Sequence, residues 1–300
     1  MNESGSRATG EQGLSSDKVT LPTFVGIGVP RAGTTWLHAM PSGHPDVFMP
    51  SVRKEIRFFD LHFDHGVDWY QAFFSSPEAA HSYAAIGEIS PQYLYCEECP
   101  DRISQTLPGV KLILMLRHPV DRAYSHYGFV VQRRNYRGSF EEFLATRPRA
   151  LEKGYYYRYV SRYLKRFDRS DILPLVFEDA VRRRSDVRQQ LASFLDVAVE
   201  GFPSSQDKVN PSTAPRFGFL SNLAVQVGRR LRRRGLERIV DLGGRIGMRR
   251  LLTSGTPIPR PDPAVKRELS RLFDDDIAAL ESCLDIDLSS WRKHEGGFNA

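Results

Sequence analysis

Cysteine is scarce in this chain, and long apolar runs are missing. The 300 residues include three cysteines, an odd number too small for a disulfide framework, which favours a reducing cytoplasm. Cys96 and Cys99 form a CxxC pair with no second pair, which by itself does not indicate a zinc or redox site. No apolar stretch reaches the roughly 18 residues that a membrane span needs, so we expect none.

The start of the chain also lacks an apolar run. Residues 1–20 are rich in Ser, Gly and charged side chains, so we expect a disordered tail and not a signal peptide. No internal repeat is visible. The rest of the chain, with 41% hydrophobic residues overall, is long enough to bury a large core, as one domain with appended segments or as two. We predict one domain over residues 21–300.

One stretch, FVGIGVPRAGTTWL over residues 24–37, organises the rest of the chain. Its apolar start predicts a strand, its Gly/Pro/Gly turn a loop, and its Thr pair the cap of a helix that runs through Met40. Backbone N–H groups at such a loop and helix start can hold a phosphate. The Gly28-x4-Gly33 spacing imitates the nucleoside-triphosphate loop, but Thr34 stands where that loop has Lys. The cation of the loop is Arg31.

The segment PRAGTTW resembles the 5′-phosphosulfate loop, P-K-x-G-[ST]-[ST], of sulfotransferases that use 3′-phosphoadenosine 5′-phosphosulfate (PAPS). Arg31 stands in place of the family lysine and keeps its charge, although a planar fork and a point charge are not equivalent. The alternative is a Gly-rich turn with no ligand. The resemblance implies that the donor is held by Arg31, Ala32, Gly33, Thr34, Thr35 and Trp36.

A carboxylate follows shortly after this loop, in KEIRFF over residues 54–59. The segment resembles the KE-x-x-FF sequence of glycosaminoglycan-type sulfotransferases, in which the glutamate is the general base. The resemblance implies that role for Glu55, and a carboxylate suits the removal of a proton from an acceptor hydroxyl. The alternative is a solvated loop acid beside buried Phe58 and Phe59.

Two further features concern the acceptor. EISPQY, residues 88–93, resembles the E-K-[ST]-P-x-Y segment beside the acceptor cleft of the same family, but Ile89 stands where the family often has Lys, which makes a glycosaminoglycan acceptor less expected. His62 and His65 have HxxH spacing, but further ligands are missing nearby, so we interpret them as solvated or packed side chains.

A second phosphate motif lies about eighty residues after the first, in VKLILMLRHPVDRAYSHY over residues 110–127. A buried strand is expected over 111–116, then Arg117, then a helix from Pro119, which places Arg117 at the edge of an open sheet where ligands bind. The pattern R-x-x-P-x-x-R-x-x-S-x-Y resembles the 3′-phosphate motif of PAPS enzymes and implies that Arg117 and Ser125 bind that phosphate. Alternatively, Arg117 is structural and pairs with Asp121.

Helices are expected over 139–145, 154–167 and 187–195, and a strand over 172–177. In the family, a polar loop such as KVNPS covers the nucleotide, so Lys208, Asn210 and Arg216 are further donor-binding candidates. Residues 215–255 form a basic helical segment, in which ten arginines against two acidic residues give a net charge of +8, while the whole chain has +6. This segment is a solvated helix face, a contact with an anionic membrane or an acceptor lid. A final helix over 264–284, capped by Asp262, completes the C-terminal part, 256–300.

We therefore predict an α/β domain with a mostly parallel sheet, helices on both faces and a P-loop-like first turn. The resemblance implies a PAPS-dependent sulfotransferase of the carbohydrate type. It would move a sulfuryl group, without a metal, to a hydroxyl or amine of a carbohydrate, glycolipid or natural-product acceptor. Glu55 would act as base, and Arg31 would neutralise the leaving phosphate. The alternatives are a nucleotide-dependent kinase, or a basic membrane- or nucleic-acid-binding protein. With the enzyme we expect a cytoplasmic location, peripheral membrane contact and no nucleic-acid partner.

Overall fold

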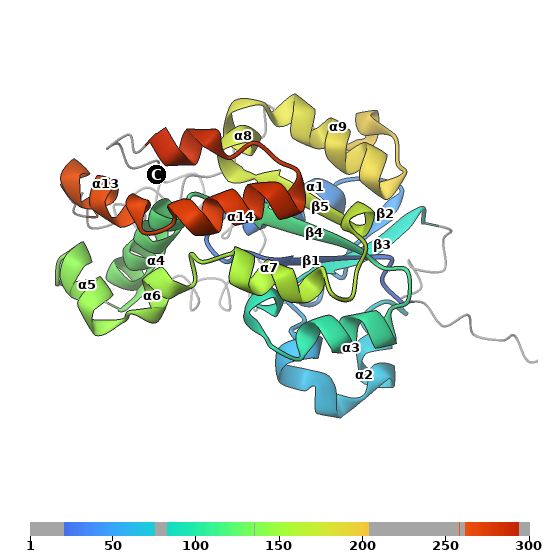
Figure 1. Ribbon diagram of the computed structural model, residues 1–300. Helices are drawn as coiled ribbons and strands as arrows, with labels where there is room; N and C mark the ends of the chain where they lie inside the picture. Colours follow the sequence, from blue (N-terminus) through green and yellow to red (C-terminus); the bar gives the residue numbers. More distant parts are fainter. Residues whose placement is uncertain (1–20, 76–82, 135, 204–257, 259–261, 294–300) are drawn as a thin grey trace, which may run out of the picture.

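A five-stranded parallel sheet forms the centre of the protein. The computed structural model describes residues 21–75, 83–134, 136–203, 258 and 262–293. Its strands run in the order β2-β3-β1-β4-β5. They are β1 (Phe24–Gly28), β2 (Val47–Phe48), β3 (Ala85–Ile89), β4 (Lys111–Leu116) and β5 (Ile172–Val176). The predicted fold class, a mostly parallel sheet with helices on both faces, is confirmed (Figure 1).

The sheet is apolar on both faces, as its continuous Val, Ile and Leu runs predict. All five residues of β1 are buried, as are the last five of β4. In β1, Phe24 pairs with Gly87 on one side and with Lys111 on the other. A side chain at Gly87 would strike the ring of Phe24, so a glycine is required opposite that aromatic residue. The central strand is therefore fixed between β3 and β4.

Helices surround the sheet, with α7 and α14 on the side towards the viewer in Figure 1 and α1 on the far side. The helices are α1 (Thr34–Ser42), α2 (Val67–Gln71), α3 (Cys99–Thr106), α4 (Pro119–Arg134), α5 (Phe140–Thr146), α6 (Arg149–Glu152), α7 (Tyr157–Tyr163), α8 (Phe177–Arg182), α9 (Arg184–Leu195), α13 (Pro263–Arg271) and α14 (Asp274–Leu284). Among the shorter turns are the π-helix η1 (Phe58–His62) and the 3-10 helices η4 (Tyr93–Tyr95) and η7 (Ser289–Lys293).

Three expected helices differ in detail. The N-cap of α1 is Gly33, in the left-handed conformation and without a side-chain cap, so the expectation that the Thr pair caps the helix is wrong. The single helix expected over 264–284 is two helices, because the chain turns at Phe273, whose buried ring packs against Tyr155 at 4.7 Å between centroids. The helix expected over 154–167 is reduced to α7.

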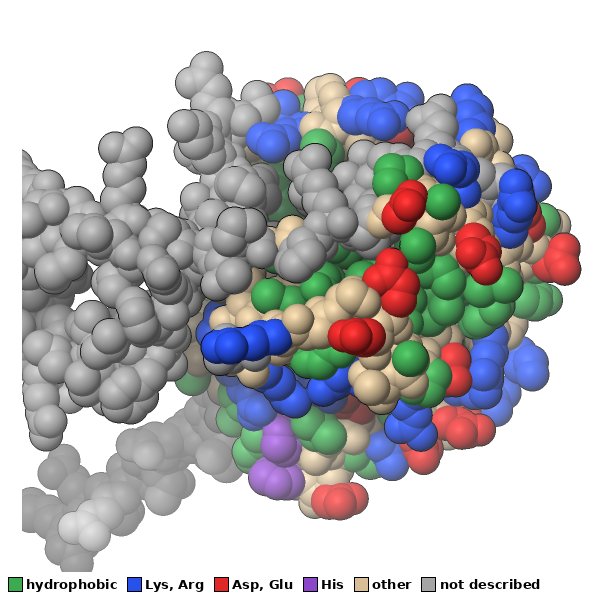
Figure 2. Space-filling view, turned by 90° about the vertical axis from the view of Figure 1, so that its left-hand side faces the viewer, with side chains coloured by type: hydrophobic (Ala, Val, Ile, Leu, Met, Phe, Trp, Pro, Cys, Tyr) green, Lys and Arg blue, Asp and Glu red, His purple; other side chains and the backbone are tan. Residues whose placement is uncertain are grey.

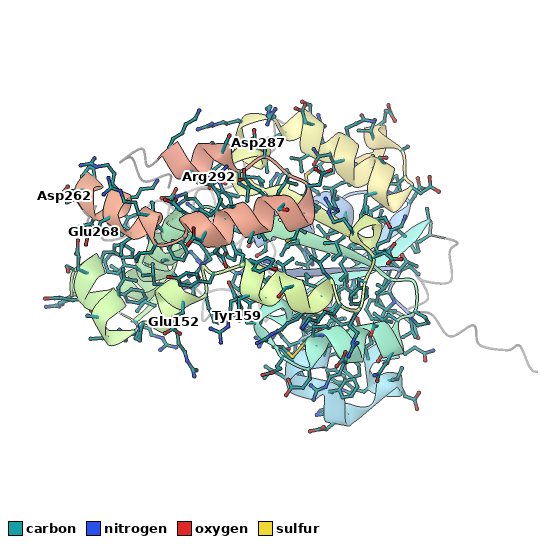
Figure 3. The ribbon with its side chains drawn as sticks, in the orientation of Figure 1. Glu152, Tyr159, Asp262, Glu268, Asp287 and Arg292 are labelled. Carbon is teal, nitrogen blue, oxygen red and sulfur yellow. A yellow bond between two sulfur atoms is a disulfide. The ribbon has the colours of Figure 1, made fainter. Side chains whose placement is uncertain are left out.

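The C-terminal helices pack against the segment that follows β4. Asp262 caps α13 as expected, its Oδ1 accepting from the Ala264 N–H at 2.7 Å (Figure 3). Lys266 on α13 is buried and reaches Asp121 on α4, with Nζ 2.9 Å from Oδ1 and 3.0 Å from Oδ2. A buried carboxylate needs such a partner. The helix α13 is thereby fixed to the start of α4.

Several sequence-based expectations concern other parts of the chain. Cys96, directly after η4, and Cys99, the first residue of α3, are joined by a disulfide with Cα atoms 5.3 Å apart, a pairing that the sequence analysis did not predict. Within the described ranges, no helix is both long and apolar enough to cross a membrane. The expected tail, 1–20, and the basic segment, 215–255, lie outside the described residues. The single domain over 21–300 stays a prediction.

Candidate functional site

Three neighbouring strands end at the same edge of the sheet, and each is followed by a predicted site segment. The phosphate loop follows β1, the segment with Ser90 follows β3, and Arg117 follows β4. Because β1 lies between β3 and β4, the three segments meet at the carboxyl edge of the sheet, where ligands bind in open α/β folds. Tertiary structure thus brings together motifs that are far apart in the sequence.

The phosphate loop needs an unusual backbone. Arg31 and Gly33 both have positive φ, 76° and 78°. A Cβ added at Gly33 would lie 2.6 Å from the ring of Phe177, so this position requires glycine for both conformation and space. Thr34 is buried, whereas Thr35 is exposed. The loop therefore presents its backbone and the Thr35 hydroxyl at the start of α1, which is the arrangement of an anion site.

Arg117 connects the two phosphate motifs. Its Nη1 donates a hydrogen bond to the carbonyl oxygen of Arg31 at 3.1 Å, and its guanidinium stacks 4.6 Å from the centroid of the Phe177 ring. The side chain is only 4% exposed, and burial lowers the pKa of Arg117, against the attraction of Asp121 and Glu178. Ser125 lies half-buried on the helix that follows, α4. The acid Asp121, expected as an alternative partner of Arg117, is held by Lys266.

Cations dominate the surroundings of the loop. Burial, and then the positive charges of Arg117, Arg133 and Arg122, lower the pKa of Arg31. The Nε of Arg31 is buried and has no hydrogen-bond partner among the described residues. Burial and the cations Arg122 and Arg31 also lower the pKa of His126 to about 4. Figure 2 shows Lys and Arg side chains gathered beside histidines on the face that lies at the left of Figure 1. Such a field attracts an anion.

Lys54 is a site residue whose contact with the loop the sequence did not reveal. Its Nζ donates to the hydroxyl of Thr35 at 2.8 Å. Burial lowers the pKa of Lys54, and the neighbouring Glu55 opposes this shift. The ammonium therefore brings a positive charge to the loop from another segment, although Thr34 leaves the lysine position of the triphosphate loop without one. The only sequence signal was the lysine directly before Glu55.

Glu55 stands half-buried between two cationic residues. Lys54 precedes it, and the following Ile56 is fully buried, which anchors the segment to the core. Arg57 has a positive φ of 61° and forms an ion pair with Asp60, its Nε lying 2.7 Å from Oδ2. Phe58 is buried, as expected. A half-buried carboxylate next to cations is chemically able to accept a proton from a hydroxyl or an ammonium group.

The remaining candidates lie apart or outside the described residues. His62 and His65 pack edge to face at 5.4 Å, and both rings contact Trp69. Over the described residues, no group of three or more His, Cys, Asp or Glu side chains could hold a metal. Ile89 is buried against Gly26. The donor-binding candidates Lys208, Asn210 and Arg216 lie outside the described residues.

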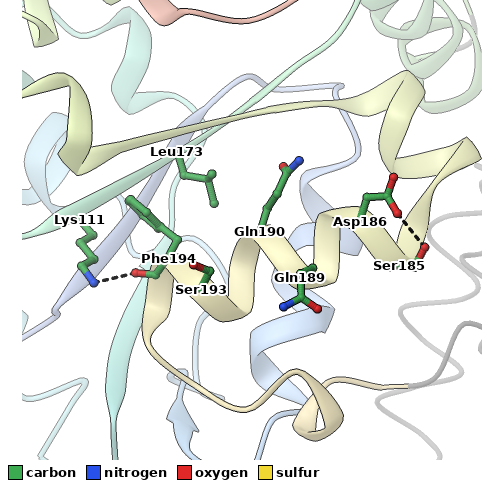
Figure 4. Close-up of a pocket in the computed structure, with 8 residues that line it drawn as sticks. All are labelled: Lys111, Leu173, Ser185, Asp186, Gln189, Gln190, Ser193 and Phe194. Carbon is green, nitrogen blue, oxygen red and sulfur yellow. Dashed lines mark hydrogen bonds between the residues drawn. The ribbon is translucent and has the colours of Figure 1, made fainter.

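A groove of about 790 Å³ lies elsewhere, between α9 and the strands β4 and β5 (Figure 4). It is lined by Lys111, Leu173, Ser185, Asp186, Gln189, Gln190, Ser193 and Phe194. Lys111 begins β4, and Arg117 follows its end, so the two lie roughly 20 Å apart at about 3.3 Å per residue. Lys111 Nζ donates to the Phe194 carbonyl at 2.7 Å. This groove is therefore separate from the three strand ends.

The sequence matches the profile of one protein family over residues 22–213, more than half of the chain, and that family is described as the sulfotransferase domain. The chain belongs to the sulfotransferase domain family. The match includes the phosphate loop, the segment of Glu55 and the segment of Arg117. The resemblance inferred from these motifs is thereby confirmed at the level of the family.

Several curated relatives of this sulfotransferase domain are large proteins. The membrane-associated sulfotransferase kil1 of Dictyostelium discoideum is 37% identical over 112 residues, which are 37% of this chain and 24% of the relative. The bifunctional heparan sulfate N-deacetylase/N-sulfotransferase 4 of Mus musculus is 31% identical over 199 residues, 59% of this chain and 22% of the relative. The chain thus spans about a quarter or less of the length of these relatives.

A solved structure shares the fold of this sulfotransferase domain. The crystal structure of a sulfotransferase from Alicyclobacillus acidocaldarius superposes with a TM-score of 0.65 over 91% of this chain and 100% of that chain. The two sequences are 24% identical, so this likeness concerns the fold.

Proposed function

We propose that this chain transfers a sulfuryl group from PAPS to a hydroxyl or amine of a carbohydrate, glycolipid or natural-product acceptor. The observation that carries the proposal is the hydrogen bond from Arg117 to the carbonyl of Arg31, which joins the two phosphate motifs at one edge of the sheet. A donor with phosphates at both its 3′ and 5′ ends needs two anion sites that lie close to each other. Membership of the sulfotransferase domain family supports this reaction.

The residues around the loop fit such a donor. The 5′-phosphosulfate would be held by the loop from Arg31 to Trp36, and the 3′-phosphate by Arg117 and Ser125. The buried Nε of Arg31, without a partner among the described residues, supports an anion there. So does the fall in the pKa of Arg31, which is caused first by burial and then by the charges of Arg117, Arg133 and Arg122, because a bound anion would offset that repulsion. Lys208, Asn210 and Arg216 remain predicted donor contacts.

In the proposed reaction, PAPS supplies a sulfuryl group on a good leaving phosphate. Glu55 accepts the proton that the acceptor hydroxyl loses as its oxygen bonds to sulfur. Arg31 neutralises the negative charge on the departing phosphate oxygen. Lys54, hydrogen-bonded to Thr35, adds a second positive charge at the same loop. This chain's own residues therefore cover proton removal and leaving-group stabilisation, and no step requires a metal ion.

The acceptor class rests on the relatives. Heparan sulfate, a carbohydrate, is part of the name of the N-deacetylase/N-sulfotransferase that is 31% identical over 199 residues, so a sugar hydroxyl or amine is the acceptor we propose. Ile89 stands where the family often has Lys, which argues for an acceptor with fewer anionic groups than a glycosaminoglycan. A relative is membrane-associated, which favours a glycolipid and peripheral contact with an anionic membrane as a further proposal.

Binding of adenosine 3′,5′-bisphosphate, compared with ATP by calorimetry, tests the donor. We expect tight binding of the bisphosphate and weak binding of ATP, and transfer from PAPS that persists in excess chelator. The kinase alternative predicts the reverse order and abolition by chelator, because the nucleoside-triphosphate loop holds its magnesium nucleotide through a Lys followed by Ser/Thr, and here Thr34 replaces that Lys.

A further inference from the structure

A second glutamate, Glu88, lies behind the segment that carries Glu55. It is the fourth residue of β3, and only 1% of its surface is exposed. Burial raises the pKa of Glu88, and hydrogen bonds from Ser90, Tyr93, Tyr70 and the backbone of Ile56 oppose the shift. At this depth it cannot touch an acceptor, so it is no rival to Glu55 as a base. A carboxylate in such a place needs another explanation, because burying it is costly.

Three hydroxyl groups converge on this carboxylate. Ser90 Oγ donates to Oε2 at 2.7 Å, while Tyr93 and Tyr70 donate to Oε1 at 2.7 Å and 2.9 Å. The carboxylate thus accepts three hydroxyl hydrogen bonds, two of them on Oε1. The backbone of Ile56, the residue after Glu55, also helps to lower its pKa.

Two of these hydroxyls continue to the backbone of the same segment. Ser90 Oγ accepts from the N–H of Arg57 at 3.1 Å. Tyr93 Oη accepts from the N–H of Phe59 at a longer 3.5 Å. Since each hydroxyl has one hydrogen and gives it to Glu88, its lone pairs face the backbone N–H groups. Tyr70 differs, because its hydroxyl contacts Glu88 without such a continuation to the segment.

We propose that Glu88 is a positioning residue that fixes the backbone of residues 57–59 through Ser90 and Tyr93 and so aims Glu55 at the acceptor. The inference rests on the proposed function for its chemical consequence. Arg57, at the centre of the segment, has a left-handed backbone that needs such support. A general base works only within hydrogen-bond reach of the proton it takes, so a small displacement of Glu55 should lower the rate strongly.

The matched pair Ser90→Ala and Tyr70→Phe tests the proposal. Each removes one hydroxyl donor to Glu88, but Ser90→Ala also removes the acceptor for the Arg57 N–H. We expect Ser90→Ala to lower kcat about 10- to 100-fold, with the donor KM and the Kd for adenosine 3′,5′-bisphosphate unchanged. Tyr70→Phe should lower the Tm by a similar amount but leave kcat within about twofold, because a hydrogen bond is lost without moving the segment. Ser90→Thr, which keeps a hydroxyl, should restore kcat.

Amide hydrogen exchange over residues 54–60 gives a readout that does not depend on activity. Ser90→Ala should speed exchange in this segment, and Tyr70→Phe should not. Equal loss of kcat in the two variants, or Ser90→Ala with the kcat of the parent protein, would overturn the proposal. If the parent protein transfers nothing from PAPS, the proposed function fails by itself. The exchange comparison then decides whether Glu88 holds the segment, and unchanged exchange in Ser90→Ala would refute that too.

Discussion

Arg117 donates from Nη1 to the carbonyl oxygen of Arg31 at 3.1 Å, across 86 positions of sequence. The ring of Phe177 lies against the same guanidinium at 4.6 Å and leaves no room for a side chain at Gly33. Buried Arg117 thus holds the phosphate loop through the Arg31 carbonyl. It also stacks on Phe177, the ring that excludes a side chain at Gly33. Loss of this arginine should therefore weaken phosphate binding.

Replacing Arg117 by Ala should reduce the preference for adenosine 3′,5′-bisphosphate over AMP about 10- to 100-fold. A charge-assisted hydrogen bond contributes roughly 1.5–3 kcal/mol, and AMP has no 3′-phosphate to lose it. Calorimetric titration of both nucleotides measures the ratio. Arg166→Ala, which removes an exposed arginine paired with Asp101, is the matched control and should keep the preference. An Arg117→Ala protein that is folded and still discriminates would remove Arg117 from the site.

Replacing Glu55 by Gln should abolish transfer and leave bisphosphate binding nearly unchanged. The amide keeps the size of the side chain but cannot take a proton, and its role concerns the acceptor and not the donor. Initial rates with PAPS and calorimetry with the bisphosphate separate the two effects. Glu97→Gln, in an exposed position, should behave like the parent protein. Near-normal turnover of Glu55→Gln would move the search for the base to His62 and His65.

Arg31 offers a way to separate turnover from stability. Its φ of 76° suits glycine, so Arg31→Gly should relieve backbone strain of order 1 kcal/mol, offset by the greater freedom of glycine in the unfolded chain. We expect a Tm close to that of the parent protein but turnover lower by about 10²–10³, the usual loss when a charge-stabilising donor is removed. Turnover within a few-fold of the parent would contradict the role of Arg31 at the leaving group.

His126 should report occupation of the cationic site. Its pKa of about 4 lies below the ordinary 6.5, so the folded protein binds fewer protons than the unfolded chain between these values. The contribution of His126 to the free energy of unfolding is therefore largest above pH 6.5 and is lost progressively as the pH falls towards 4. Bound bisphosphate should raise this pKa, since it offsets the charge of Arg31 and Arg122. An imidazole NMR titration, assigned with His126→Asn, measures both states; equal pKa values would place the anion elsewhere.

The basic segment, outside the described residues, yields a test of membrane contact. Its densest cations are Arg229, Arg230, Arg232, Arg233 and Arg234. If they bind a membrane, changing all five to Gln should release the protein from anionic vesicles, raised salt should mimic the change, and turnover on a soluble acceptor should persist. An acceptor lid would instead raise the acceptor KM and show no vesicle binding in the parent protein. If the substituted protein matched the parent protein in both assays, both proposals would fail and the segment would be a solvated helix face.

The sequence alone predicted the strands and the phosphate loop well, because these depend on local signals. The run KLILML is apolar enough to be a buried strand wherever it lies, and it coincides with β4. The Gly-rich turn before Thr34 indicated a phosphate loop, and the structure requires glycine at Gly33 because φ is positive there and the ring of Phe177 leaves no room for a Cβ. The motifs around Arg31 and Arg117 were sufficient to identify the family, which the match over residues 22–213 confirms.

Contacts between distant segments could be decided only by the tertiary structure. The pairing of Lys54 with Thr35, the capture of Asp121 by Lys266 and the convergence of donors on Glu88 depend on which strands become neighbours. Local pattern carries no information about such partners, because the strand order β2-β3-β1-β4-β5 differs from the order in the sequence. The break at Phe273 has the same cause: helical periodicity continues through it, but a buried ring must reach Tyr155, and packing outweighs local propensity.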